Sequence, residues 1–123
     1  MAKIMIVDDD EDFVTAVALV LKKNDFEVLT ANSLKEGIEK FETNHPDLVL
    51  LDVIMEQPDD GFVIAQTLKK RNSLVPILMI TSIGQVTGMD FGKDEEFAPV
   101  DDFIQKPVMP SKLIEKINLL LKK

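Results

Sequence analysis

Four stretches of the sequence each bring a polar side chain to the end of an apolar run. Three aspartates, Asp8 to Asp10, follow one run, Asp52 follows another, and Thr81 and Lys106 close two more. Carboxylates held together favour a bound cation, and oxygen ligands without His or Cys select a hard ion such as Mg²⁺. Thr81 and Lys106 would donate to the oxygens of a phosphoryl group. Asp52 is the candidate nucleophile toward phosphorus, because it stands alone at the end of the most apolar run.

The runs that precede these polar residues have the composition of buried strands. Residues 4–7, 48–51 and 77–80 are wholly apolar and end abruptly at a polar side chain. This pattern is typical of short strands that are covered on both faces. Phe26–Ala31 and Phe103–Ile104 are predicted as two further strands.

Helical patterns separate the strands. Glu11 to Lys23 carries one apolar stripe, Ser33 and Glu36 form a capping box that opens a second helix, and Gly61 to Arg71 is predicted as a third. Pro110 suits the first turn of a last helix. The residues expected to face inward are Phe13, Ala16, Val17, Val20 and Leu21; Leu34, Ile38 and Phe41; Ile64, Ala65 and Leu68; and Leu113, Ile114, Ile117, Leu120 and Leu121.

This alternation explains how distant polar residues would meet. Strands that alternate with helices form a parallel sheet with helices on both faces. The carboxyl ends of such strands lie at one edge, where ligands bind in doubly wound sheets. The sequence therefore predicts an α/β fold with its functional site at that edge.

The composition narrows the class of protein. The chain has 123 residues, no Cys, one His and a net charge of −8, so we expect one domain over residues 1–123 and exclude thiolate or multi-histidine metal sites. The acidic balance argues against nucleic acid as a direct partner. No apolar run approaches a membrane span and no signal peptide is evident, so we expect a cytoplasmic protein.

Taken together, these stretches resemble the receiver domain of two-component response regulators, the CheY-like family. The resemblance covers nearly the whole chain, and residues 6–10, 46–55, 60–62, 76–82 and 102–107 carry it. It implies a flavodoxin-like, doubly wound, five-stranded parallel sheet with strand order 2-1-3-4-5. Because the sequence ends just after the last predicted helix, we expect a stand-alone regulator that acts on a downstream protein target.

The resemblance also implies how the phosphoryl group is accepted. Asp52 would receive it from a sensor histidine kinase or a His-phosphotransfer protein. Asp8, Asp9, Asp52 and the backbone carbonyl of Ile54 would hold Mg²⁺. On this interpretation the chain is not an enzyme, although it would assist its own phosphorylation and dephosphorylation.

The resemblance further implies a switch. Thr81 and Lys106 would bind the phosphoryl group, and a cis Lys106–Pro107 peptide would place the lysine. Phe103 matches an aromatic switch position, whose ring would occupy the space that Thr81 leaves. From the residues alone, Phe103 fits a core position equally well.

The sequence also departs from the family pattern. Glu56 stands where the family usually has Pro, Gly61 comes one residue late, and Ser82 takes a position that is often Ala or Gly. The segment Ile83–Asp101 contains three glycines, each costing about 1 kcal/mol inside a helix. We therefore expect the fourth helix of the fold to be short or disordered.

Two other functions compete with this interpretation. A pseudo-receiver would keep the fold as an interaction module without phosphorylation, and the altered Ile83–Asp101 segment favours it. A phosphohydrolase of the haloacid dehalogenase type would use the Asp-x-Asp of Asp8 and Asp10. That chemistry needs acidic ligands after Lys106, where the sequence offers only Glu115.

Overall fold

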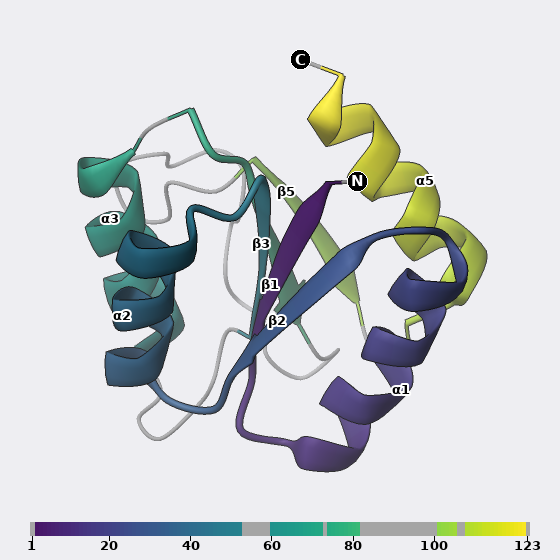
Figure 1. The fold of residues 1–123 in the computed structure, drawn as a ribbon, viewed down its shortest axis with the longest axis horizontal. Coiled ribbons are helices and arrows are strands. Elements are labelled where there is room, and N and C mark those ends of the chain that lie inside the picture. The colour runs from purple at the N-terminus through teal and green to yellow at the C-terminus, as the bar shows by residue number, and fades with distance from the viewer. Residues whose placement is uncertain (1, 53–59, 73, 82–100, 106–107, 123) are drawn as a thin grey trace.

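Strands and helices alternate along the chain as the sequence predicts (Figure 1). The computed structural model describes residues 2–52, 60–72, 74–81, 101–105 and 108–122. Within them the elements are β1 (Lys3–Val7), α1 (Glu11–Lys23), β2 (Glu27–Ala31), α2 (Leu34–Asn44), β3 (Leu48–Asp52), α3 (Asp60–Arg71), β4 (Ile77–Thr81), β5 (Asp102–Gln105) and α5 (Pro110–Leu121). The element boundaries lie within one residue of those predicted. The region 82–100, on which the expectation of a short or disordered fourth helix falls, lies outside the described residues.

The strands form one parallel sheet in the order β2-β1-β3-β4-β5. This order confirms the doubly wound topology with strand order 2-1-3-4-5. In Figure 1, α2 and α3 cover one face of the sheet, and α1 and α5 cover the other. Both faces are therefore covered, as the wholly apolar strands predict.

Successive residues of the central strands point to opposite faces and so build two cores. In β1, Met5 and Val7 belong to the cluster on the α2 and α3 side, whereas Ile4 and Ile6 belong to the cluster on the α1 and α5 side. All four are fully buried. Burial of one such side chain contributes roughly 1.5–3 kcal/mol, so the two-sided sheet is the main stabilising element.

The helices bury most of the residues predicted to face inward. Phe41, Ala65 and Leu68 are buried against one face of the sheet, and Val17, Leu21, Leu113, Ile117 and Leu120 against the other. Ala16 is an exception, because it is exposed to solvent. The apolar stripe predicted for α1 is therefore wider than the part of α1 that the rest of the fold buries.

The amino-terminal end of β1 is fastened by its one lysine. The backbone N–H of Lys3 donates to Asp47 Oδ2 at 2.7 Å, and Asp47 N donates back to Lys3 O at 2.7 Å. The Lys3 ammonium donates to the carbonyl of Asn44 at 3.0 Å and lies 3.6 Å from Glu27 Oε2. These contacts join β1 to β2 and to the start of β3.

A second lysine fastens the amino-terminal ends of β4 and β5. Lys69 Nζ at the end of α3 donates to Asp101 Oδ2 at 2.7 Å and to the carbonyl of Val75 at 3.0 Å. The same Asp101 oxygen accepts from the backbone N–H of Ile77 at 2.8 Å. Asp101 thus sets the register with which β5 enters the sheet.

Candidate functional site

The register of the sheet brings the predicted strand-end residues to one edge. Val7 is paired with Leu51 across β1 and β3, so the next residues along these neighbouring strands are Asp8 and Asp52. Adjacent strands lie about 4.8 Å apart. The backbone positions of two predicted metal ligands are therefore neighbours at the carboxyl edge.

The same edge continues across β4 and β5. Asp52 is paired with Ile80, and Thr81, one residue further, ends β4 opposite Gln105. Gln105 directly precedes Lys106 in the sequence. Ile54, Lys106 and Pro107, three of the predicted site residues, lie outside the described residues, as do Glu56 and Ser82.

Asp8 is a carboxylate that the fold has taken out of water. Its exposed fraction is 1%. In the described part of the chain, no other polar or charged residue is buried. Its Oδ1 accepts from the backbone N–H of Asp10 at 2.9 Å, and its own N–H donates to Ala31 O at 3.0 Å. A buried carboxylate is costly unless donors or a cation stabilise it, which points to a ligand-binding role.

The next two aspartates differ in what holds them. Asp10 caps α1, because its Oδ1 accepts from the backbone N–H of Phe13 at 3.2 Å. An aspartate is favourable at this position because its side chain satisfies a backbone N–H of the first turn. Asp9 lies between them in the sequence, and it is exposed to solvent.

The donors at this edge suit a hard divalent cation. The predicted ligands are carboxylate and carbonyl oxygens, without imidazole or thiolate, which matches the preference of Mg²⁺. Among the described residues, no group of three or more Asp, Glu, His or Cys side chains is placed to hold a metal ion. The oxygen donors of the predicted ligand set are of the type that binds Mg²⁺. How these ligands are arranged around the ion stays a prediction.

A polar cavity of about 300 Å³ adjoins the buried aspartate. Asp8, Glu11, Thr15, Thr30, Asn32 and Glu36 line it, so β1, α1, β2 and the start of α2 all contribute. No site role was expected from the sequence for Thr30, Asn32 or Glu36. The sequence feature that could have indicated them is the capping box of Ser33 and Glu36, because it places the start of α2 directly after β2.

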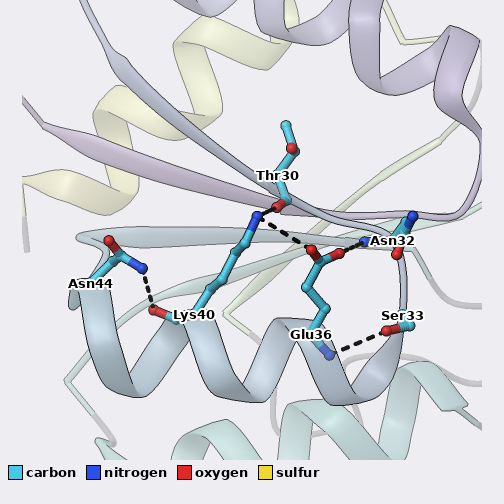
Figure 2. A network of polar contacts seen from close by, with 6 residues as sticks. All are labelled: Thr30, Asn32, Ser33, Glu36, Lys40 and Asn44. Carbon is cyan, nitrogen blue, oxygen red and sulfur yellow. Dashed lines mark hydrogen bonds and ion pairs between the residues drawn. The ribbon is translucent and has the colours of Figure 1, made fainter.

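Figure 2 shows the polar network that links three of these lining residues, Thr30, Asn32 and Glu36, at the start of α2. Ser33 Oγ accepts from the N–H of Glu36 at 3.1 Å, as the capping box predicts. The Glu36 carboxylate accepts from the N–H of Asn32 at 2.7 Å and lies 3.4 Å from Lys40 Nζ, which also donates to the carbonyl of Thr30. The hydrogen bond from Asn32, aided by the nearby Lys40 charge, lowers the pKa of Glu36.

Phe103 lies on the opposite face of the sheet from α1. It is half-buried, is paired with Met79 in the register, and packs against the core cluster beneath α2 and α3. The described structure thus supports its role as a core residue. Its role as a switch stays a prediction.

No helix in the described parts of the chain is both long and apolar enough to cross a membrane.

Comparison with known proteins points to a single family. The profile of the response regulator receiver domain matches residues 4–118. The alkaline phosphatase synthesis transcriptional regulatory protein PhoP of Bacillus subtilis is 33% identical over 98% of this chain and 49% of its own length. The chain spans about half the length of the curated relatives it matches.

Solved structures agree with the sequence comparison. A response regulator receiver domain protein from Clostridium thermocellum has a TM-score of 0.87 at 27% identity, covering 99% of this chain and 95% of that one. The receiver domain of NtrX from Brucella abortus has a TM-score of 0.83 at 27% identity, covering 98% of each chain. The whole described fold is therefore similar to this one class of domain.

Proposed function

Because the chain belongs to the response regulator receiver domain family, we propose that it acts in phosphorelay signalling by accepting a phosphoryl group on Asp52. The observation that carries this proposal is the β1–β3 register, which makes Asp52 the neighbour of the buried Asp8 at the carboxyl edge. The donor is a phosphohistidine of a sensor histidine kinase or of a His-phosphotransfer protein. Receiver domains are signalling domains, so the chain has a transfer role and is not a classical enzyme.

The transfer exchanges one bond to phosphorus for another. An oxygen of the Asp52 carboxylate attacks phosphorus, the bond from phosphorus to the donor imidazole nitrogen breaks, and the imidazole takes up a proton from water. The product is an acyl phosphate on Asp52. The adjacent Asp8 and Asp9 raise the local negative charge, so the site needs a cation before a second anion can enter.

The residues named from the sequence would share the remaining tasks. Asp8, Asp9, Asp52 and the carbonyl of Ile54 would hold Mg²⁺, which when bound neutralises charge on the phosphoryl oxygens. Thr81 and Lys106 would donate to those oxygens. The same groups would assist both phosphorylation and hydrolysis of the acyl phosphate.

The output of the site is a change in a protein-binding surface. Movement of Thr81 toward the phosphoryl group would alter the space beside Phe103, which shares the β4–β5 pair with it. Lys106 would keep its place through a cis bond to Pro107. We expect residues 1–123 to act as one domain in the cytoplasm, with proteins as direct partners and neither nucleic acid nor a membrane bound directly.

The test is stoichiometric labelling of the whole chain. Acetyl phosphate with Mg²⁺, followed by intact-mass measurement, should add one phosphoryl group to the wild type and none to Asp52→Asn. Asp47→Asn is the matched control, since Asp47 lies just before the other end of the same strand, and it should be labelled like the wild type. Circular dichroism should show all three folded.

Equal labelling of Asp52→Asn and the wild type would disprove the assignment of Asp52. A folded wild type that neither acetyl phosphate nor a phosphorylated kinase labels would instead favour the pseudo-receiver, a binding module without phosphorylation.

A further inference from the structure

The capping box at the start of α2 has two halves with different partners. In one half, Ser33 Oγ accepts from the N–H of Glu36 at 3.1 Å, inside the first turn of the helix. In the other half, the Glu36 carboxylate accepts from the N–H of Asn32 at 2.7 Å (Figure 2). The glutamate of a capping box usually returns to the N-cap residue itself, here Ser33. Glu36 instead reaches one residue further back, to the residue that follows β2.

The peptide unit between Ala31 and Asn32 joins this helix to the buried aspartate. Its N–H, which belongs to Asn32, donates to Glu36 Oε1 at 2.7 Å. Its carbonyl, which belongs to Ala31, accepts from the backbone N–H of Asp8 at 3.0 Å. Both groups belong to one planar unit, so they cannot move independently of each other. A single peptide therefore connects the Glu36 carboxylate to the backbone of Asp8.

The charge of Glu36 strengthens this connection. A hydrogen bond to a carboxylate is shorter and stronger than one to a neutral acceptor. Hydrogen bonds in series also polarise one another, so a peptide whose N–H is bound by an anion has a carbonyl that accepts more strongly. The lowered pKa of Glu36 agrees with this, because the Asn32 N–H stabilises the charged carboxylate. The Ala31 carbonyl therefore holds the Asp8 N–H most firmly while Glu36 is in place.

Lys40 fixes the other side of the same carboxylate. Its Nζ lies 3.4 Å from Glu36 Oε2 and donates to the carbonyl of Thr30 (Figure 2). The Thr30 carbonyl belongs to the peptide just before the Ala31–Asn32 peptide. Glu36 and Lys40 thus bind two consecutive peptides at the carboxyl end of β2, and α2 cannot shift along the strand without breaking both contacts.

Asp8 lies just beyond the last register pair of β1. Val7 is paired with Ala31, and the bond from Asp8 N–H to the Ala31 carbonyl extends the ladder by one step. The Asp8 side chain is oriented separately, because its Oδ1 accepts from the N–H of Asp10 at 2.9 Å. The bond to Ala31 therefore fixes the backbone position from which this buried carboxylate extends.

We propose that Glu36 is a positioning residue for the cation site, which holds Asp8 in place through the Ala31–Asn32 peptide. This inference rests on the proposed function, since it takes Asp8 as a ligand of Mg²⁺. Loss of a group that orients a metal ligand directly lowers metal affinity by about 10–100-fold. Glu36 acts one peptide further away, so we expect its loss to weaken Mg²⁺ binding by about three- to tenfold.

The hydrogen bond of Glu36 has to be separated from its charge. Glu36 and Glu11 both line the cavity of Asp8, so either carboxylate could attract a cation to this edge. Lys40 lies 3.4 Å from Glu36 and compensates part of its charge, which makes direct attraction by Glu36 weak. Glu36→Gln and Glu11→Gln each remove one charge, and the glutamine at position 36 keeps an oxygen acceptor for Asn32. Glu36→Ala removes the charge and the acceptor together.

Titration of the full chain with MgCl₂, followed through amide NMR shifts at a temperature where every variant is folded, gives the Kd of Mg²⁺. Glu36→Ala should raise it by about three- to tenfold. Glu36→Gln and Glu11→Gln should raise it by less than about twofold, because one exposed charge has a small effect in water. Ser33→Ala is the matched control for helix capping. It should lower the melting temperature, as Glu36→Ala does, and leave the Kd within about twofold of the wild type.

The metal-free chain gives a second readout. The scalar coupling across the hydrogen bond between Asp8 N–H and the Ala31 carbonyl reports the strength of that bond, and hydrogen exchange of the Asp8 amide reports how often it opens. In Glu36→Ala the coupling should fall and the exchange should become at least about threefold faster. Ser33→Ala and Glu11→Gln should leave both close to the wild type.

Four results would overturn the inference. If Glu36→Ala binds Mg²⁺ as tightly as the wild type, Glu36 has no positioning role, while the proposed function stands. If Glu36→Ala, Glu36→Gln and Glu11→Gln weaken binding equally, the charge of the cavity alone is responsible. If Ser33→Ala weakens it as much as Glu36→Ala, the effect belongs to the stability of α2. A wild type that binds no Mg²⁺ would contradict the proposed ligand set itself, and this inference with it.

Discussion

At the amino-terminal edge of the sheet, Glu27 and Asp101 are paired with lysines, whereas at the carboxyl edge Asp8 and Asp10 accept hydrogen bonds from backbone amides. Lys69 lies 2.7 Å from Asp101 Oδ2, in an ion pair that is largely shielded from water. At the other edge, Asp8 accepts from the N–H of Asp10, and Asp10 accepts from the N–H of Phe13. The described contacts of these carboxylates therefore differ: a lysine ion pair at the amino-terminal edge and backbone hydrogen bonds at the carboxyl edge.

This difference separates structure from function. A carboxylate that is paired with a lysine within the chain has its charge compensated there, so it stabilises the fold. At the carboxyl edge, backbone amides orient the carboxylates of Asp8 and Asp10, and we expect a cation to bind there. We expect substitutions at the amino-terminal edge to change stability, and those at the carboxyl edge to change ligand binding.

The largest effect should come from Mg²⁺ at the carboxyl edge. At roughly a hundred times its Kd, Mg²⁺ should raise the free energy of unfolding of the wild type by about 2.7 kcal/mol. Asp8→Asn should lose most of this gain, since the amide keeps an acceptor for Asp10 N–H but loses the charge. Chemical denaturation with Mg²⁺ and with chelator measures both values. Undiminished stabilisation of the variant would contradict the proposed ligand set.

Asp101→Ala should have the next largest effect, and it should act on stability alone. It removes the acceptor for both the Lys69 ammonium and the Ile77 N–H, so we expect a loss of about 2 kcal/mol. Denaturation in chelator measures it, and the gain from Mg²⁺ should be unchanged. Glu42→Ala, which breaks the more exposed pair with Arg71, is the control and should cost less than about 1 kcal/mol. If both variants lost the same free energy of unfolding, the contacts of Asp101 would be no more important for stability than an exposed ion pair.

Glu36→Gln should give the smallest effect, and pH should reveal it. The pKa of Glu36 is lowered from its usual value of 4.5, so its charged form stabilises the fold above that pH. That contribution disappears as the pH falls through the lowered pKa. Because the side chain is 39% exposed, we expect a few tenths of a kcal/mol at pH 7. Denaturation between pH 3 and 7 should show wild type and variant converging in acid, and an unchanged difference across this range would contradict the prediction.

The sequence was sufficient to predict the elements and the edge of the sheet at which Asp8, Asp52 and Thr81 lie. A run such as residues 48–51 is short and wholly apolar, so it is most stable when covered on both faces, and this requires parallel strands with helices on either side. The backbone positions of Asp8, Asp52 and Thr81 then lie at one edge, because every strand runs in the same direction. These inferences need only local composition and chain order.

Contacts between elements could be decided only by the tertiary structure. The periodicity of α1 predicts a wide apolar stripe, but the position of α5 decides that Val17 is buried and Ala16 is exposed. Similarly, the capping box marks the start of α2, but the placement of α2 beside β2 brings Glu36 to the cavity of Asp8. Local pattern sets which face of a helix is apolar, whereas packing geometry sets how much of that face is covered, because coverage depends on neighbours that are distant in the sequence.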